Sequence, residues 1–352
     1  ILKEREQVTV FVNGLWLATR PDPASAELAV HPVLLQHPNP RRVLLLGGGP
    51  GGHLAEVLRH PSVENVDYVE QDPELIELTE GVVEAESRRL SGQDRVRVLQ
   101  RDAGTFVRQA KESYDVILMN VGDPINAQMN RFYTEEIFGR LDERLLPGGI
   151  LTFSVPGGGD MVGPSHARLL GSLHRTLRQV FPAVRAVPGE RARFFAARDE
   201  ASLVLDPAVL GRRIGERGLE LVHVREDTLD DLMNPMRLDY LATILADRQN
   251  SPINRLFTPI CYFQGMMLWA SQWNPAMGRW IGRAAAAPPA WLVAAVGLVG
   301  ISTILFFWLG KPRYLAAVGT SVMAVGAVGM VLQVVLILIF QILAGFAYLQ
   351  LA

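Results

Sequence analysis

Short apolar runs alternate with longer amphipathic stretches through the first part of the chain. Five of these runs have the length and composition of buried strands, at residues 43–46, 66–70, 96–100, 114–119 and 150–155. Four stretches between them carry apolar positions at helical spacing, at residues 53–60, 74–90, 105–111 and 135–145. Strands and helices that alternate in this way predict an α/β fold with a doubly wound, mostly parallel sheet.

Other elements flank this core. Residues 8–18 alternate around Asn13-Gly14, a strong hairpin signal, and residues 25–36 form a helical pattern before the first core strand. The later elements are a helix at 167–180, two strands at 183–187 and 193–197, a helix at 207–217 and a mixed, mainly helical stretch at 227–246. The hairpin is interpreted as the remnant of a small β-domain.

The C-terminal part has a different pattern. From residue 284 onward the only charged side chains are Lys311 and Arg313, which explains a mean hydropathy of +0.17 despite 20% charged residues. Residues 290–309 form an apolar run long enough to cross a hydrocarbon core about 30 Å thick, and residues 315–346 form a second. Residues 259–273 are shorter and are interpreted as an interfacial or core helix.

These patterns divide the chain into four expected segments. They are a β-hairpin remnant at 1–24, the α/β domain at 25–205, a helical extension with a membrane-docking segment at 206–283, and transmembrane helices at 284–352. Ile1 begins the sequence without a leader pattern, and no polar tail follows the last apolar run. We therefore expect a piece of a longer polypeptide that contains further membrane spans.

Composition narrows the function classes. A net charge of −2 and a pI near 6.4 give no basic surface, so we expect no nucleic-acid partner. Cys261 is the sole cysteine, which excludes an internal disulfide and a cysteine-based metal cluster. The histidines lack metal-ligand spacing, and we expect no metal.

The most informative stretch is GGGPGG at 47–52, which follows the first core strand and precedes a helix. Glycine turns let a ligand approach the backbone, and free N–H groups there suit a polar or anionic ligand. The next strand ends at Glu70, eighteen residues beyond Gly52, where a carboxylate can hold both hydroxyls of a ribose. The order of strand, turn, helix, strand and acid predicts nucleoside binding by Gly47, Gly49, Gly51, Gly52 and Glu70.

Three more polar residues follow predicted strands: Asp102, Asn120 and Asp123. Ligands of doubly wound sheets bind beyond the carboxyl ends of the strands, so one binding site can hold these residues and the glycine loop.

At this point the chain resembles the spermidine synthase (polyamine aminopropyltransferase) family, and in particular its branch fused to membrane helices. The similarity runs from about residue 8 to about residue 200 and resumes in the C-terminal apolar runs. The matching stretches are HP at 31–32, HPNP at 37–40, GGGPGG at 47–52, EQDP at 70–73, DA at 102–103, YDVI at 114–117, DP at 123–124, AQMNRFYT at 127–134 and LPGG at 146–149.

The resemblance implies a Rossmann-like fold of the S-adenosylmethionine methyltransferase type. It also implies decarboxylated S-adenosylmethionine, or S-adenosylmethionine itself, as the nucleoside ligand. Glu70 would hold the ribose, Asp102 with Ala103 the adenine, and the glycine loop the sulfur-bearing chain. An amine would attack the carbon beside the sulfonium, with Asp123 as the base.

The resemblance further implies contacts between the amine acceptor and Gln128, Arg131 and Tyr133. Arg131 and Tyr133 can equally pair within the domain, and Asp123 can instead cap a turn. A homodimer is kept as a candidate assembly, and the lipid bilayer is an expected partner.

Three departures from the family pattern fall on the substrate side, and the one at Pro50 removes an acid that would bind the donor's cationic amine. The family carries acids where this chain has Asn120 and Pro50, and a Tyr-His pair where it has Ser25-Ala26. Asparagine orients an amine but cannot take its proton. Asn120 is kept as a second catalytic candidate, and altered or absent aminopropyl transfer is an expectation.

Two further readings stay open beside the transferase: a catalytically inactive nucleoside-binding regulatory domain of a transporter-like membrane protein, and a methyltransferase that uses S-adenosylmethionine. A nicotinamide dehydrogenase is weaker, because the later motifs do not fit it. Basic residues are balanced around the first apolar run and do not orient it. We expect an integral protein of the bacterial inner membrane, with the α/β domain cytoplasmic because its ligand is made there.

Overall fold

The computed structural model describes residues 2–4, 7–12, 15–79, 95–273, 297–298, 300–301, 305 and 313–344. The chain divides into two compact units, Ile1–Gly265 and Met266–Ala352. The finer boundaries expected at residues 24, 205 and 283 stay predictions.

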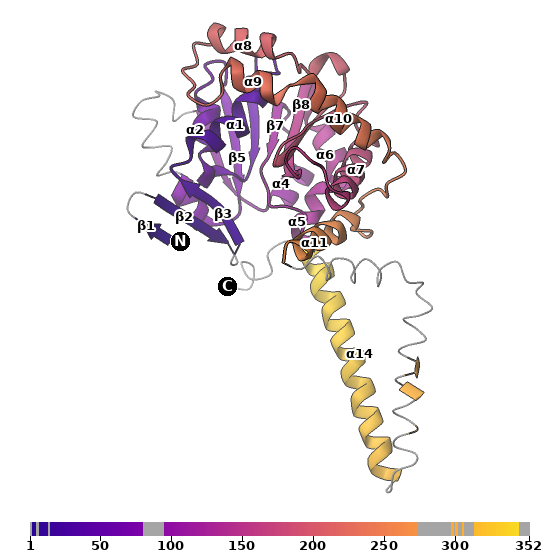
Figure 1. Ribbon diagram of the computed structural model, residues 1–352. Helices are drawn as coiled ribbons and strands as arrows, with labels where there is room; N and C mark the ends of the chain where they lie inside the picture. The colour runs from indigo at the N-terminus through magenta and orange to yellow at the C-terminus, as the bar shows by residue number, and fades with distance from the viewer. Residues whose placement is uncertain are drawn as a thin grey trace. The chain divides into compact units, whose positions relative to one another are not determined.

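The first unit is built on a seven-stranded sheet in the order β6-β5-β4-β7-β8-β10-β9 (Figure 1). Its strands are β4 Arg42–Leu46, β5 Asn65–Glu70, β6 Val96–Gln100, β7 Tyr114–Met119, β8 Leu145–Pro156, β9 Ala183–Val187 and β10 Arg191–Ala197. The five strands from β6 to β8 pair in parallel, whereas β10 pairs antiparallel with β8 and with β9. The expected α/β class with a mostly parallel sheet is confirmed.

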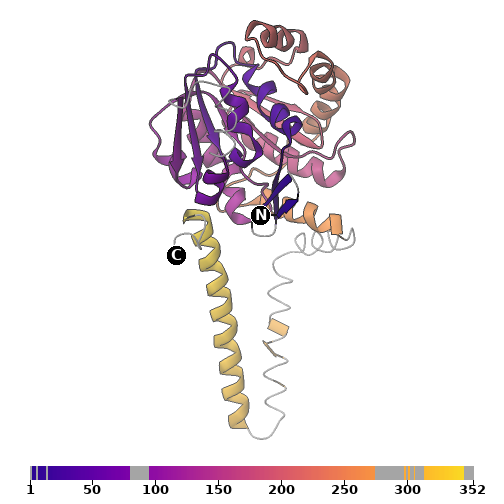
Figure 2. The same cartoon turned by 90° about the vertical axis from the view of Figure 1, so that its left-hand side faces the viewer.

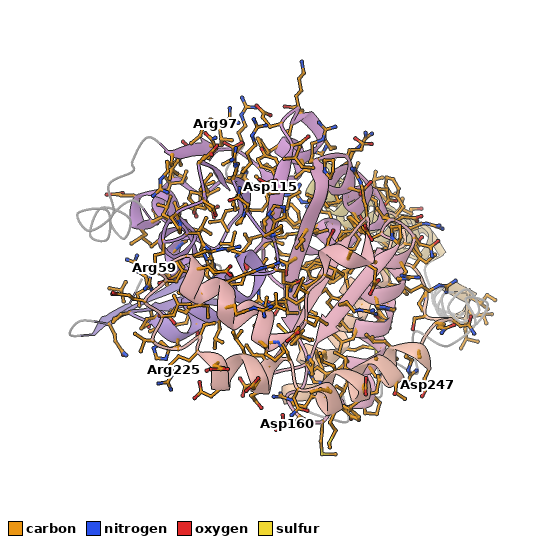
Figure 3. The ribbon with its side chains drawn as sticks, turned by 90° about the horizontal axis from the view of Figure 1, so that it is seen from above. Arg59, Arg97, Asp115, Asp160, Arg225 and Asp247 are labelled. Carbon is orange, nitrogen blue, oxygen red and sulfur yellow. The ribbon has the colours of Figure 1, made fainter. Side chains whose placement is uncertain are left out.

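The chain order reverses between β4 and β7. It runs outward from β4 through β5 to β6, and then returns to β7 on the opposite side of β4. In a doubly wound sheet, this reversal opens a crevice at the carboxyl ends of the two central strands. The start of β7 is tied to the start of β4, because Asp115 accepts hydrogen bonds from the backbone N–H groups of Arg41 and Arg42, both at 2.8 Å (Asp115 is labelled in Figure 3).

Helices cover both faces of the sheet (Figures 1 and 2). The first-unit helices of six residues or more are α1 Pro23–Leu34, α2 His53–Leu58, α4 Ala103–Gln109, α6 Glu135–Glu143, α7 Pro164–Arg178, α8 Pro207–Glu216, α9 Glu226–Leu232 and α10 Pro235–Ala246. Alternate strand residues such as Leu45 and Phe195 pack with α1, α2, α8 and α9 in one apolar cluster. On the other face Phe153 of β8 stacks on Phe138 of α6, with ring centroids 5.6 Å apart. Successive residues of a strand point to opposite faces of the sheet. Because helices cover both faces, the central strands are apolar at nearly every position.

Most expected elements are confirmed, with shifted ends. Helix α4 begins two residues earlier than expected because Asp102 caps it, and β8 begins at Leu145 rather than at residue 150. The expected hairpin is present as β2 Gln7–Val12 paired antiparallel with β3 Leu15–Arg20. A third strand, β1 Leu2–Glu4, joins it in a separate sheet that the pattern does not predict. The Asn13-Gly14 turn lies outside the described residues.

Two helices belong to the C-terminal region. Helix α11 Ile260–Trp273 crosses the boundary between the units, and α14 Arg313–Ala344 is a continuous helix in the second. Of the helices in the described ranges, none qualifies as a segment that could cross a membrane. The predicted spans are therefore not supported at residues 315–346, although the mean hydropathy of the sequence there suggests them, and residues 290–309 lie mostly outside the described ranges.

Candidate nucleoside and acceptor site

The glycine loop lies between the two central strands, where the chain reverses direction. The Gly47 N–H donates to the Val69 carbonyl of β5 at 3.0 Å, and the Asn120 N–H donates to the Leu46 carbonyl of β4 at 2.9 Å. These bonds hold the ends of β4, β5 and β7 together. The residues expected at the strand ends therefore share one edge of the sheet.

Two glycines of this loop have no tolerance for a side chain. Gly47 and Gly48 have φ values of +69° and +80°, the left-handed region in which other residues are strained. A Cβ on Gly47 would lie 2.9 Å from the Asn120 carbonyl oxygen. A Cβ on Gly48 would lie 2.3 Å from Nδ1 of His53 and 3.1 Å from Nδ2 of Asn120. The imidazole and the amide thus converge over the loop backbone.

Nδ1 of His53 and Nδ2 of Asn120 are buried, and neither makes a hydrogen bond of standard geometry with the described residues. Burial is the main cause that lowers the pKa of His53 to about 4, and the charge of Arg193 is the second, so the ring is neutral at pH 7. A contact with the Gly48 backbone acts on the pKa of His53 in the direction opposite to burial. Buried polar atoms are nearly always paired, so two orphans side by side mark a place where a ligand can supply the partners.

Glu70 is arranged to accept hydrogen bonds at the end of β5. Its Oε1 accepts from the backbone N–H groups of Gln71 at 2.7 Å and Asp72 at 3.1 Å. Its Oε2 accepts no hydrogen bond from the residues that the structure describes. Burial raises the pKa of Glu70 against the opposing effect of those two N–H groups. The backbone fixes one oxygen and leaves the other able to accept a hydrogen bond from a ligand.

Asp102 and Arg131 are paired with each other. Oδ1 of Asp102 accepts from the backbone N–H and the hydroxyl of Thr105, at 2.8 and 2.9 Å, and thereby caps α4. The same carboxylate forms a two-pronged ion pair with the guanidinium of Arg131, whose side chain is only 2% exposed. Of the two roles left open for Arg131, the internal pairing is the one observed. Ala103 is the first residue of α4, directly beside this pair.

Asp123, the expected base, is held by an arginine from a different strand. Nη2 of Arg191 lies 2.6 Å from its Oδ1, and Nη1 lies 3.3 Å from its Oδ2. Arg191 also donates to the hydroxyl and carbonyl oxygens of Ser154, at 3.2 and 2.8 Å. To take a proton from an amine, Asp123 has to exchange at least one of these contacts.

Arg193 lies two residues further along β10, on the same face of the sheet as Arg191. Its Nη1 donates to the Ala29 carbonyl of α1 at 2.7 Å. No Asp or Glu among the described residues lies within 4.0 Å of its guanidinium. Neither arginine is among the site residues predicted from the sequence. The available signal was the start of β10 itself, where Arg191 and Arg193 alternate with buried Ala192.

The remaining expected contacts differ in availability. Nε2 of Gln128 is buried and has no partner among the described residues, which fits a ligand contact. Tyr133 is fully buried, and its hydroxyl donates to the Gly122 carbonyl at 3.1 Å. Tyr133 thus shapes the loop that carries Asp123.

We call Glu70, Asp102 and Arg131 the β5–β6 side, and Asn120, Asp123, Arg191, Arg193 and His53 the β7–β10 side. A cavity of about 530 Å³ lies elsewhere, lined by residues of α8 and the start of α9, including Arg212, Arg225 and Glu226. It contains none of the strand-end residues. In the described parts of the chain, no group of three or more His, Cys, Asp or Glu side chains could hold a metal ion.

The chain is similar to known proteins of one family over the α/β part. Residues 23–187 match the family model described as the spermine/spermidine synthase domain. A curated polyamine aminopropyltransferase of Synechococcus sp. (strain JA-2-3B'a(2-13)) is 34% identical over 182 residues, which cover 50% of this chain and 57% of that protein. One from Leptospira interrogans is 30% identical over 154 residues, or 43% of this chain and 31% of that protein. The chain thus spans between about a third and about half the length of these relatives.

Solved structures resemble the fold. A spermidine synthase crystallised with the transition-state analogue AdoDATO superposes with a TM-score of 0.55 at 23% identity, covering 68% of this chain and 80% of that one. The spermidine synthase of Thermotoga maritima gives a TM-score of 0.53 at 22% identity, covering 68% and 79%.

Proposed function

Because residues 23–187 match the spermine/spermidine synthase family model, we propose that this chain is a transferase of the polyamine aminopropyltransferase type. Its donor is decarboxylated S-adenosylmethionine, and its acceptor is an amine. The curated relatives named above carry this activity in their names, and the strand-end residues supply a matching arrangement.

The observation that carries the proposal is the position of Glu70 beside the glycine loop. A ribose presents two adjacent hydroxyls, and a carboxylate at the end of the second strand accepts hydrogen bonds from both. Oε2 of Glu70 is available for this contact, while Oε1 is fixed by Gln71 and Asp72. The glycine loop, with the side chains of His53 and Asn120 over Gly48, then faces the chain that leads to the sulfur.

The transfer is a substitution at carbon. The neutral amine nitrogen forms a bond to the carbon beside the sulfonium, the carbon–sulfur bond breaks, and its electron pair neutralises the sulfur. The product nitrogen sheds one proton, and the leaving group is methylthioadenosine. Asn120 orients the amine through its amide, and Asp123 receives the proton once an Asp123–Arg191 contact is exchanged.

Nucleoside binding is the first test. The full chain is titrated calorimetrically with methylthioadenosine, which has the nucleoside but no charged chain. We expect Glu70→Gln to weaken binding by about 10-fold to 100-fold, because a charge-assisted bond to a hydroxyl is lost. Glu143→Gln changes an exposed carboxylate on α6 and serves as the control. Methylthioadenosine binding that is absent, or indifferent to Glu70, would refute the nucleoside assignment.

Turnover is the second test. Methylthioadenosine release from decarboxylated S-adenosylmethionine is followed by mass spectrometry with a panel of amines. We expect Asp123→Asn to lower the rate at least about 100-fold, because the proton acceptor is lost. Nucleoside affinity should be retained, because Glu70 is unchanged. Nucleoside binding without release of methylthioadenosine for any amine would instead favour a regulatory domain.

Membrane association is a separate part of the proposal. Helix α14 exposes large apolar side chains such as Val322, Val325 and Met330 at 66%, 73% and 71%. Apolar exposure of this extent favours contact with a lipid or protein surface. We propose that residues 284–352 attach the protein to the bacterial inner membrane, with the α/β domain in the cytoplasm. Alkaline extraction of membranes tests this: release of the full chain into the supernatant would contradict it.

A further inference from the structure

Arg193 has more hydrogen-bonding capacity than the protein uses. A guanidinium carries five N–H donors, and in the described structure one of the groups on Arg193 is engaged, by the Ala29 carbonyl. We propose that Arg193 binds the carboxylate of a substrate that combines an amine with a carboxylate. The inference rests on the proposed function for the place of the reacting amine, and it replaces a simple diamine by an amino-carboxylate.

The charge balance on the β7–β10 side supports this assignment. The charge of Arg191 is matched by Asp123 through the two-pronged contact. Arg193 has no such match among the described carboxylates, and it is only partly exposed. Burial, together with the nearby charge of Arg191, lowers the pKa of Arg193 to about 10, which still leaves it charged at neutral pH. A partly buried cation without a counter-charge is costly, and a bound anion removes that cost.

Arg193 lies two residues along β10 from Arg191, the residue that holds Asp123. The charge of Arg193 acts on His53, and His53 shares the space over Gly48 with Asn120. A neutral imidazole nitrogen without a partner can accept a hydrogen bond from an amine, and the amide of Asn120 can donate or accept one. The site thus offers neutral polar groups for a nitrogen and a cation beside them for a carboxylate.

A diamine fits the same groups less well. Its second nitrogen is an ammonium at neutral pH, and like charges repel strongly where water is partly excluded. With Asp123 already paired to Arg191, the β7–β10 side carries a net positive charge from Arg193. Repulsion between Arg193 and a second ammonium weakens the binding of a diamine. Attraction between Arg193 and a carboxylate strengthens the binding of a zwitterion.

The carboxylate can come from two sources with the same chemistry. It can belong to the acceptor, as in an ω-amino acid, or to the donor, as in S-adenosylmethionine with its amino-carboxylate retained. Two matched pairs of ligands separate these sources. γ-Aminobutyrate and putrescine differ at one end group, and S-adenosylmethionine differs from its decarboxylated form only in the carboxylate.

The experiment titrates the full chain calorimetrically with both pairs, the acceptor pair in the presence of saturating methylthioadenosine. In at least one pair, we expect the carboxylate member to bind at least about 10-fold more tightly, the usual size of a charge-assisted contact. Arg193→Met should reduce this preference to less than about threefold, and Arg193→Lys should restore part of it. Arg185→Met, which removes an exposed cation from β9, should leave it unchanged.

Each outcome decides the inference. A preference in the donor pair assigns the carboxylate to the nucleoside, and one in the acceptor pair assigns it to the amine. Equal affinities in both pairs, tighter binding of putrescine, or a preference that persists in Arg193→Met would overturn the inference. Methylthioadenosine binding is read separately with Glu70→Gln, so failure of the nucleoside assignment is distinguishable from failure of the carboxylate assignment. The wild-type comparison stands even where Arg193→Met does not fold.

Discussion

The two sides of the strand-end site treat their charges differently. On the β5–β6 side, Asp102 satisfies Arg131 and caps α4, and the backbone fixes one oxygen of Glu70. On the β7–β10 side, Arg193 has no carboxylate partner in the described structure, and nitrogens of His53 and Asn120 are orphaned. Of the groups on the first side, only Oε2 of Glu70 is left for a ligand, whereas the second side has several donors and acceptors that a ligand would satisfy.

This difference suggests a division of labour. The β5–β6 side, whose charges are already paired within the protein (the prepaired side), can bind a ligand with little rearrangement of its side chains. It therefore suits the part of the ligand that does not vary between substrates, the nucleoside. A side with unsatisfied groups discriminates, because a wrong ligand leaves those groups unpaired. We therefore expect the β5–β6 side to control stability and nucleoside affinity, and the β7–β10 side to control the choice of substrate.

The largest expected effect tests the prepaired side. Asp102→Asn keeps the cap on α4 but removes the charge that compensates Arg131, which is 2% exposed. Loss of one partner of a buried pair costs about 3–5 kcal/mol, and we expect the free energy of unfolding in urea to fall by that amount. Adding Arg131→Met should recover much of the loss, since no unpaired charge is left.

An exposed pair provides the control for this prediction. Glu143→Gln breaks a solvent-exposed contact with Arg140 and should leave the free energy of unfolding close to that of the wild type. If Asp102→Asn lowered the free energy of unfolding no more than Glu143→Gln, the β5–β6 side would not depend on its ion pair. The proposed difference between the two sides of the site would then be wrong.

The sequence predicts the prepaired side better than the other. The glycine loop and Glu70 are local features, each at the end of an apolar run, and their positions in a parallel sheet follow from strand order. The partner of Asp102 is 29 positions away, and periodicity does not specify which cation reaches it. Sequence analysis could therefore only leave the role of Arg131 open.

The β7–β10 side is harder to predict because it is assembled from distant segments. Asp123 and Arg191 are 68 positions apart and meet because β10 returns antiparallel to β8. In the parallel strands the C-terminal end lies at the site. Because β10 runs antiparallel to β8, its N-terminal end lies there instead. The residues that start β10, and not those that end it, therefore lie beside the glycine loop.

An intermediate effect tests the glycine loop that joins the two sides. Gly48→Ala places a Cβ 2.3 Å from Nδ1 of His53 at a φ of +80°. Strain and overpacking together should cost about 2–4 kcal/mol and weaken methylthioadenosine binding. Gly139→Ala on α6 meets nothing within 4 Å and should instead stabilise by about 0.5–1 kcal/mol. Thermal unfolding and calorimetry measure both, and unchanged nucleoside binding in Gly48→Ala would exclude a close approach to this loop.

The smallest effect is a pH dependence from the β7–β10 side. Burial and the charge of Arg193 hold the pKa of His53 at about 4, against 6.5 for a free side chain, while Glu56 acts in the opposite direction. Below pH 6.5 the unfolded chain takes up a proton that the folded protein refuses until about pH 4, so stability should fall across this window. Between pH 7 and pH 5 we expect the free energy of unfolding to fall by about 2 kcal/mol, and His53→Gln should remove this loss. His174, whose pKa burial also lowers to about 4, is the control: His174→Gln should flatten acid unfolding without changing ligand choice. A His53→Gln variant with the same acid profile as the wild type would show that this ring is not held neutral by its surroundings.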